Sequence, residues 1–291
     1  MKRYRVIAAA LCILFVGTTV LAQEGDEIDW NARAPWGSLR RGDRGNWESF
    51  KKEPFQIFDN LYYVGLNTVS AYLITTSDGL ILLDATYAET ADFVLDSIRQ
   101  LGFSPADLEY VIVSHGHGDH HAGAARIKEV TAARVVLSAE DWDFIESRDQ
   151  MAGLTRDVEA KDGEELTLGD TTITFYVSPG HTPGSLTTTY TVRDGDQSYL
   201  ALSPGGLGFN FGPESTATYI ASIERLRNIG GFSVVLPNHP YMAPGDLFEL
   251  MKGVDGRTDS ATHPVAIGET AVNDWLDGIL EAAREKLAAG Q

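Results

Sequence analysis

Hydrophobic and polar positions alternate in short segments between residues 55 and 84. The segments are separated by Asp-Asn at 59–60 and by Ser-Asp-Gly at 77–79. These are turn sequences, because Asp, Asn and Gly accept the backbone angles that tight turns require. The pattern therefore predicts a meander of one sheet, with strands at residues 55–58, 61–64, 70–75 and 80–84.

After residue 84 the apolar spacing alternates between helix-like and strand-like. We expect helices near 89–101, 122–130, 215–228 and 269–287, and strands at 110–113, 134–137, 185–192, 198–202 and 233–236, with a hairpin turn at 193–196. Residues 165–177 form a strand-rich segment in which 171–177 is expected to be a strand. Strands followed by helices occur twice along the chain, which suggests two packed sheets with helices outside. The predicted fold class is α/β, an αββα sandwich of two mixed sheets.

The first 22 residues have the pattern of a secretory signal peptide. Three basic residues precede an apolar run from residue 6 to residue 20, and the small Ala22 comes before the polar Gln23. The run is short for a transmembrane helix, although an uncleaved anchor is an alternative. We therefore expect a periplasmic or secreted protein that has no membrane segment after cleavage.

Residues 23–291 are expected to form a single catalytic domain, in which residues 23–54 form an N-terminal arm on the surface. The tryptophans of this arm, Trp30, Trp36 and Trp47, are interpreted as packing anchors. The single cysteine, Cys12, lies in the signal peptide, so the mature chain would have neither a disulfide nor a thiolate metal ligand.

Charge narrows the range of partners. The formal net charge is −18, which would repel nucleic acid and favours a small-molecule substrate. The simplest reason for the acidity is solubility. No pattern in the sequence indicates an oligomeric state.

Four of the seven histidines fall between residues 115 and 121, directly after the apolar strand at 110–113. His115 and His117 are two apart in an extended stretch, so their side chains lie on the same side. Asp119 and His120 come after the chain has begun to turn and can face a different centre. Imidazoles with one carboxylate and no thiolate suit zinc, iron or manganese, with zinc slightly favoured.

This segment resembles the metallo-β-lactamase superfamily, in which His-x-His-x-Asp-His follows a buried strand. The resemblance implies two further ligands, His181 and His239, each of which follows a predicted strand. It also implies that Asp84 supports the metal loop from a neighbouring strand, with a turn-capping carboxylate as the alternative. The implied zinc ligands are His115, His117 and His181 for the first ion, and Asp119, His120 and His239 for the second.

The other two histidines receive no ligand role. His121 is expected to lie behind the ligands or to face solvent, and His263 is expected at the surface.

Ser203 indicates which members of the superfamily the chain resembles most. Glyoxalase-like thioesterases and lactonases carry a bridging aspartate after the strand that corresponds to 198–202, and two subclasses of true β-lactamases carry a cysteine as a metal ligand. Serine together with three first-site histidines resembles the third subclass of class B metallo-β-lactamases.

On this resemblance the protein is a secreted hydrolase with two Zn²⁺ ions. A hydroxide held between the metals would attack the β-lactam amide, Asp119 would orient it, and Ser203 would donate a hydrogen bond to the substrate carboxylate. A turn serine without a substrate role is the alternative for Ser203. The glycine-rich stretch 205–208 is interpreted as a flexible loop at the mouth of the cleft and not as a phosphate cradle.

Other functions remain open on the sequence. The nearest is a dizinc hydrolase of another cyclic ester or amide, such as a lactone, followed by a thioesterase. An oxidoreductase of the flavodiiron type needs a glutamate where His117 stands. A metal-binding module without activity would bind zinc but turn over no labile amide or ester.

Overall fold

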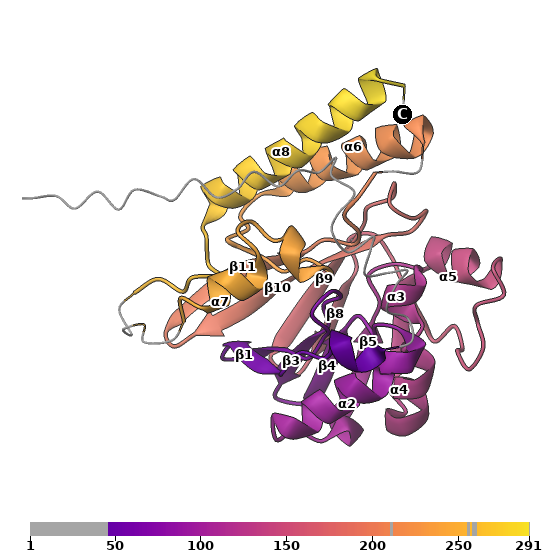
Figure 1. The fold of residues 1–291 in the computed structure, drawn as a ribbon, viewed down its shortest axis with the longest axis vertical. Coiled ribbons are helices and arrows are strands. Elements are labelled where there is room, and N and C mark those ends of the chain that lie inside the picture. The colour runs from indigo at the N-terminus through magenta and orange to yellow at the C-terminus, as the bar shows by residue number, and fades with distance from the viewer. Residues whose placement is uncertain (1–45, 210–211, 255–256, 258–260, 291) are drawn as a thin grey trace, which may run out of the picture.

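Two β-sheets pack face to face between two layers of helices (Figure 1). The computed structural model describes residues 46–209, 212–254, 257 and 261–290. The expected signal peptide, residues 1–22, lies outside the described residues, as do residues 23–45 of the expected arm with Trp30 and Trp36.

The first sheet is seven-stranded, in the order β1-β2-β3-β4-β5-β6-β7. Neighbours from β1 to β4 are antiparallel, and those from β4 to β7 are parallel. The strands are β1 (Phe55–Phe58), β2 (Leu61–Tyr63), β3 (Tyr72–Thr76), β4 (Gly79–Leu83), β5 (Leu108–Ile112), β6 (Arg134–Ser138) and β7 (Val158–Ala160).

The second sheet is five-stranded, in the order β12-β11-β10-β9-β8. All of its pairs are antiparallel except β11 with β12, so both sheets are mixed. The strands are β8 (Glu165–Leu168), β9 (Thr171–Val177), β10 (Leu186–Asp194), β11 (Gln197–Ser203) and β12 (Val234–Val235).

Helices cover the outer face of each sheet. The α-helices are α2 (Ala91–Gln100), α3 (Gly118–His121), α4 (Ala124–Thr131), α5 (Ala139–Glu146), α6 (Pro213–Ile229), α7 (Leu247–Met251) and α8 (Glu269–Ala288). The short 3₁₀ helices are η1 (Trp47–Phe50), η2 (Ala88–Thr90), η3 (Pro105–Asp107) and η4 (Pro240–Met242). In Figure 1, α6 and α8 lie beyond one sheet, and α2 and α4 lie beyond the other. No helix in the described ranges is both long enough and apolar enough to cross a bilayer.

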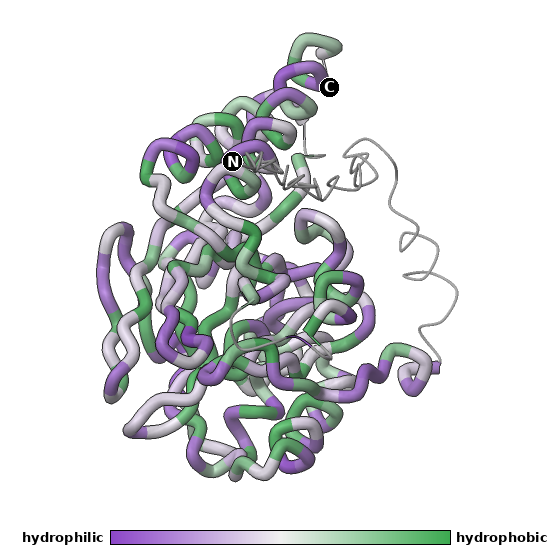
Figure 2. Tube along the Cα trace, turned by 90° about the vertical axis from the view of Figure 1, so that its left-hand side faces the viewer, coloured by the Kyte–Doolittle hydropathy of each residue, from purple (hydrophilic) through white to green (hydrophobic). Residues whose placement is uncertain are grey.

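Three large apolar clusters hold the four layers together. One lies between the sheets and includes Ile74, Ile81 and Phe175. A second joins the first sheet to α2, α4 and α5, and a third joins the second sheet to α6 and α8. Figure 2 shows the corresponding alternation of hydrophobic and hydrophilic residues along the outer helices. Burying each large apolar side chain of this kind contributes roughly 1.5–3 kcal/mol.

The αββα sandwich predicted from the sequence is confirmed, but several element boundaries were wrong. The strand-rich segment 165–177 forms a hairpin of β8 and β9, in which Gly169 adopts a positive φ of 54° at the turn, and the strand expected at 171–177 is β9. The expected helix 122–130 is α4, which begins two residues later, and α3 precedes it. The sequence patterns also missed α5, β7 and α7.

Candidate metal centre

The segments that carry the predicted ligands meet at one rim of the sandwich, where β5, β9 and β12 end. The segment after β5 carries His115 and His117 and continues into α3, which carries the other two ligands of the motif. The loop after β9 carries His181, and the loop after β12 carries His239. The structure brings the six side chains together as two adjacent groups that could each hold a metal ion.

The first group consists of His115, His117 and His181. His181 Nε2 lies 3.1 Å from His115 Nε2 and 3.1 Å from His117 Nδ1. All the ligand atoms of the group lie within 4.8 Å of one another. Three ring nitrogens therefore converge on a single point.

Backbone carbonyl groups fix the orientation of two of these rings. His115 Nδ1 lies 2.8 Å from the Gly205 carbonyl oxygen, and His181 Nδ1 lies 3.0 Å from that of Gly208. A carbonyl oxygen only accepts, so each Nδ1 carries the hydrogen and each Nε2 keeps its lone pair. Two lone pairs only 3.1 Å apart repel unless a cation lies between them, so this geometry fits a metal ion.

The second group consists of Asp119, His120 and His239, which are all buried. The His117 carbonyl accepts the backbone N–H of His120 at 2.9 Å, which starts α3 and turns this part of the motif away from the first group. Asp119 Oδ2 lies 3.6 Å from His120 Nε2 and 3.9 Å from His239 Nε2. The ring centroids of His115 and His120 lie 4.2 Å apart, so the two groups are neighbours.

Asp84 holds this second group from behind. Its Oδ2 accepts from His120 Nδ1 at 2.8 Å, and its two oxygens accept from the backbone N–H and hydroxyl of Ser114 at 2.7 and 2.9 Å. On the other side, His239 Nδ1 donates to the Thr68 carbonyl at 2.8 Å. These bonds leave Nε2 of both histidines directed at Asp119, as metal ligation requires.

Two histidines of the first group, His115 and His181, are held in the neutral form. Burial, followed by the nearby rings of His120 and His181, lowers the pKa of His115 well below its usual 6.5. Burial, with the neighbouring His117, lowers the pKa of His181 to about 3. Neutral imidazole is the form that binds metals, so these donors are available at pH 7.

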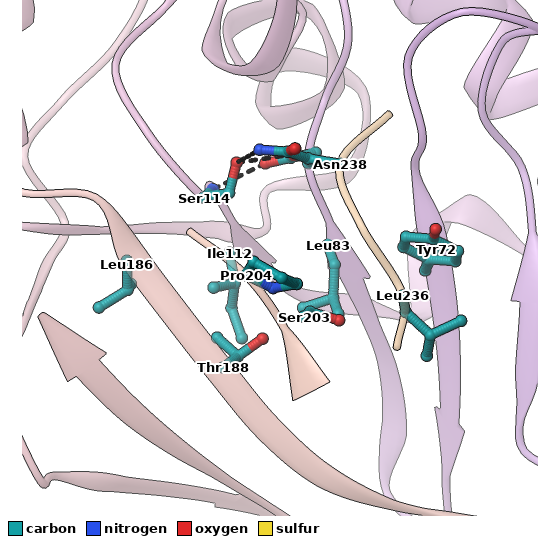
Figure 3. Close-up of a pocket in the computed structure, with 11 residues that line it drawn as sticks. Tyr72, Leu83, Ile112, Ser114, Leu186, Thr188, Ser203, Pro204, Leu236 and Asn238 are labelled. Atoms are coloured by element: carbon teal, nitrogen blue, oxygen red, sulfur yellow. Dashed lines mark hydrogen bonds between the residues drawn. The ribbon is translucent and has the colours of Figure 1, made fainter. Parts of the chain in front are cut away.

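Ser203 lies at the end of β11, and its hydroxyl lies 2.9 Å from the Tyr190 hydroxyl. It lines a small pocket between the sheets, together with Ser114, Asp84 and Asn238, behind the ligand segments (Figure 3). The predicted hydrogen bond from Ser203 to a substrate stays a prediction.

The two remaining histidines are both buried. Of the two positions expected for His121, the structure shows the one behind the ligands: its Nδ1 donates to the His117 carbonyl at 3.0 Å, so it braces the loop. The prediction that His263 lies at the surface was wrong. It is buried and stacks on Phe58, with ring centroids 4.1 Å apart.

The sequence also gave no indication of several groups that support the ligands. Three are the backbone carbonyls of Thr68, Gly205 and Gly208, which leave no trace in residue identity. The loop 205–208, expected to be a flexible element at the cleft mouth, thus orients two ligands. A fourth group is Asp141, whose position three residues after Ser138 has the spacing of an ordinary helix cap.

The packing anchor predicted at Trp47 is confirmed. The centroid of its ring lies 5.5 Å from the ring centroid of Phe50 and 5.2 Å from that of Tyr87. The described start of the chain is therefore attached beside η2.

Comparison with known proteins places these features in a wider context. Residues 64–196 match the family described as "Metallo-beta-lactamase superfamily". The chain is 32% identical over 199 residues to hydroxyacylglutathione hydrolase of Methylococcus capsulatus, a match that covers 63% of this chain and 73% of that protein. It is 31% identical over 104 residues to N-acyl homoserine lactonase AttM of Agrobacterium fabrum, which covers 31% of this chain and 38% of that protein.

A third relative is the uncharacterized protein YobT of Bacillus subtilis, 24% identical over 138 residues, which is 43% of this chain and 58% of YobT. The chain thus matches less than two thirds of the length of YobT and of AttM.

Solved structures match over a greater length. BJP-1, a subclass B3 metallo-β-lactamase of Bradyrhizobium japonicum, superposes with a TM-score of 0.71 and 29% identity, covering 83% of this chain and 96% of that one. The FEZ-1 metallo-β-lactamase of Legionella gormanii gives a TM-score of 0.72 and 28% identity, covering 83% and 98%. The predicted similarity to the third subclass of class B enzymes is confirmed.

Proposed function

Because the chain belongs to the metallo-β-lactamase superfamily and is a metallo-hydrolase, we propose that it uses two zinc ions to open the amide bond of β-lactam rings. The observation that carries this proposal is the pair of adjacent ligand groups, on a fold that matches subclass B3 enzymes over 83% of its length. The pattern of residues 1–22 supports a periplasmic or secreted location.

The donor chemistry supports zinc. Five imidazoles and one carboxylate, with no thiolate, are suitable zinc ligands, and their ring orientations are fixed by hydrogen bonds. When bound, such ions polarise a carbonyl group and make a hydroxide available at neutral pH.

The protein residues have distinct roles in this proposal. Asp119, at the centre of the second group, accepts a hydrogen bond from the attacking water and so orients it toward the amide carbon. The six ligands hold the metals, and Asp84 orients His120. Ser203 donates a hydrogen bond to the substrate carboxylate. To do so, its hydroxyl gives up the hydrogen bond that it forms with the Tyr190 hydroxyl in the free protein.

The second candidate is hydrolysis of a lactone or thioester, and the named activities of AttM and of hydroxyacylglutathione hydrolase favour it. Ser203 argues against it, because the superfamily's lactonases and thioesterases carry a bridging aspartate at this position.

We expect the purified protein to hydrolyse nitrocefin, and we expect a chelator to abolish the turnover. His181→Ala should lower kcat/KM by at least about a hundredfold, because a metal ion contributes several kcal/mol to the stabilisation of the transition state. His263→Gln is the matched control: it removes a buried histidine outside the metal centre and should retain the activity.

The same assay separates the candidate substrates. A penicillin, a carbapenem, an acyl-homoserine lactone and a hydroxyacylglutathione thioester would be compared at equal zinc. Chelator-sensitive turnover of the lactone or thioester, without turnover of any β-lactam, would refute the proposed substrate class.

A further inference from the structure

Asp141 is a buried carboxylate that contacts both segments of the first metal site. It lies in the first turn of α5 and is 1% exposed. Its Oδ2 accepts the Gly116 backbone N–H and the Thr182 hydroxyl, each at 2.7 Å, and its Oδ1 accepts the Gly184 backbone N–H at 2.7 Å. Burial raises the pKa of Asp141, and these three bonds oppose the shift.

The three bonded groups adjoin all the ligands of the first site. Gly116 lies between His115 and His117, and Thr182 follows His181 directly. One carboxylate therefore connects the segment after β5 to the loop after β9. The second site is held by different groups, since Asp84 orients His120 and the Thr68 carbonyl orients His239.

The position of α5 is itself fixed against these segments. Ser138 Oγ accepts the Asp141 backbone N–H at 3.1 Å and donates to the Gly184 carbonyl at 2.6 Å. A Cβ added to Gly116 would lie 2.8 Å from Phe144 Cδ1, and one added to Gly184 would lie 2.1 Å from Ser138 Oγ. The helix therefore packs directly on the backbone of both segments and leaves Asp141 little freedom.

We propose that Asp141 is the positioning residue of the first metal site, and that it sets the separation of His115 and His117 from His181. A carboxylate suits this task because it is an acceptor only and meets three donors. An asparagine of the same shape would direct its NH₂ group at one or two of those donors. The inference rests on the proposed metal centre but not on the substrate.

The test is the stepwise zinc affinity of the Asp141→Asn variant, measured by competition of the full-length apoprotein with a chromophoric chelator. We expect one of the two zinc ions to bind about tenfold to a hundredfold more weakly, as is typical when a residue that supports a metal ligand is changed. In a His239→Ala background, which impairs the second site, Asp141→Asn should cause the same loss.

Asp157→Asn is the matched control. Asp157 also accepts a backbone N–H, from Val135 at 2.9 Å, a hydroxyl, from Thr155 at 2.6 Å, and a bond from Lys128, but it bridges no ligand segment. The Asp157→Asn variant should bind both zinc ions with the affinities of the wild type. Urea unfolding of the two apo variants, Asp141→Asn and Asp157→Asn, measures the loss of stability that they share.

Equal zinc affinities for Asp141→Asn and Asp157→Asn would overturn the proposal and leave Asp141 a structural residue. If Asp141→Asn does not fold, Thr182→Val removes only one of the three donors, and unchanged zinc binding in that variant would likewise count against the proposal. Wild-type protein that binds zinc but hydrolyses no β-lactam would refute the proposed substrate and leave this inference intact.

Discussion

Asp84 combines an unfavourable backbone conformation with a dense set of hydrogen bonds. Its φ is 62°, in the left-handed region that residues with a Cβ seldom adopt. The carboxylate accepts three bonds from His120 and Ser114 while it is 4% exposed. Such strain persists only where the surroundings impose it, and it is typical of functional sites.

We expect Asp84→Asn to weaken the binding of the second zinc by about tenfold to a hundredfold, because His120 loses the acceptor that fixes its ring. The first zinc should bind with almost unchanged affinity, which distinguishes this variant from Asp141→Asn. Stepwise chelator competition measures both constants. Equal weakening of both ions would contradict a specific link between Asp84 and His120.

At the scale of elements, His263 connects the chain after α7 to β1 and to the end of β10. It stacks on Phe58 of β1 and lies near the ion pair between Asp194 and Arg257, whose shortest N–O distance is 2.6 Å. Burial lowers its pKa below the usual 6.5, and Arg257 adds to this shift, while the charges of Asp194 and Asp59 oppose it.

This lowered pKa predicts a loss of stability in acid. Below about pH 6.5 the unfolded chain binds a proton at residue 263 that the folded chain still resists, so the contribution of neutral His263 is complete above that pH and falls as the pH drops toward the folded pKa. The difference in urea unfolding free energy between wild type and His263→Gln, at equal zinc, should shrink between pH 7.5 and pH 5. If this difference in unfolding free energy were the same at both pH values, it would contradict the conclusion that His263 is neutral in the folded protein.

The elements that could be predicted are those with local signals. The meander β1 to β4 is bounded by turn residues, and the periodic helices α6 and α8 have long apolar stripes. The helix α3 could not be predicted, because Gly-Asp-His-His has no helical pattern and its turn is set by bonds to the His117 carbonyl. The strand β9 could also be predicted, because buried and more exposed residues alternate along 171–177.

The two candidate ligand groups could be predicted because their side chains carry the chemistry. Their supports could not, since backbone carbonyls at Gly205, Gly208 and Thr68 have no sequence signature. Asp141 was missed for a different reason: its partners are 25 to 43 residues away in sequence, and only the folded chain brings them together.

On the scale of the whole molecule, the ligands come from both sheets. His115 and His117 follow β5 of the first sheet, whereas His181 and His239 follow β9 and β12 of the second. Bound metal would therefore cross-link the two halves of the sandwich at one rim.

We expect a chelator to lower the melting temperature of the protein. At free zinc about a thousandfold above Kd, binding adds roughly 4 kcal/mol to the folded state, which corresponds to roughly 8–16 °C for a chain of this size. Calorimetry with and without chelator measures the shift, and the double variant His181→Ala, His239→Ala should lose most of it. Identical melting curves for the wild-type protein in both conditions would contradict a metal that joins the sheets.

The order of the ligands along the chain has a consequence for maturation. The first of them is residue 115 and the last is residue 239, so a nascent polypeptide cannot offer a full coordination sphere until residue 239 has left the ribosome. Under the proposed export, a precursor that crosses the membrane unfolded would be loaded completely with metal only in the destination compartment. The supply of zinc in that compartment, rather than in the cytoplasm, would set the fraction of active enzyme.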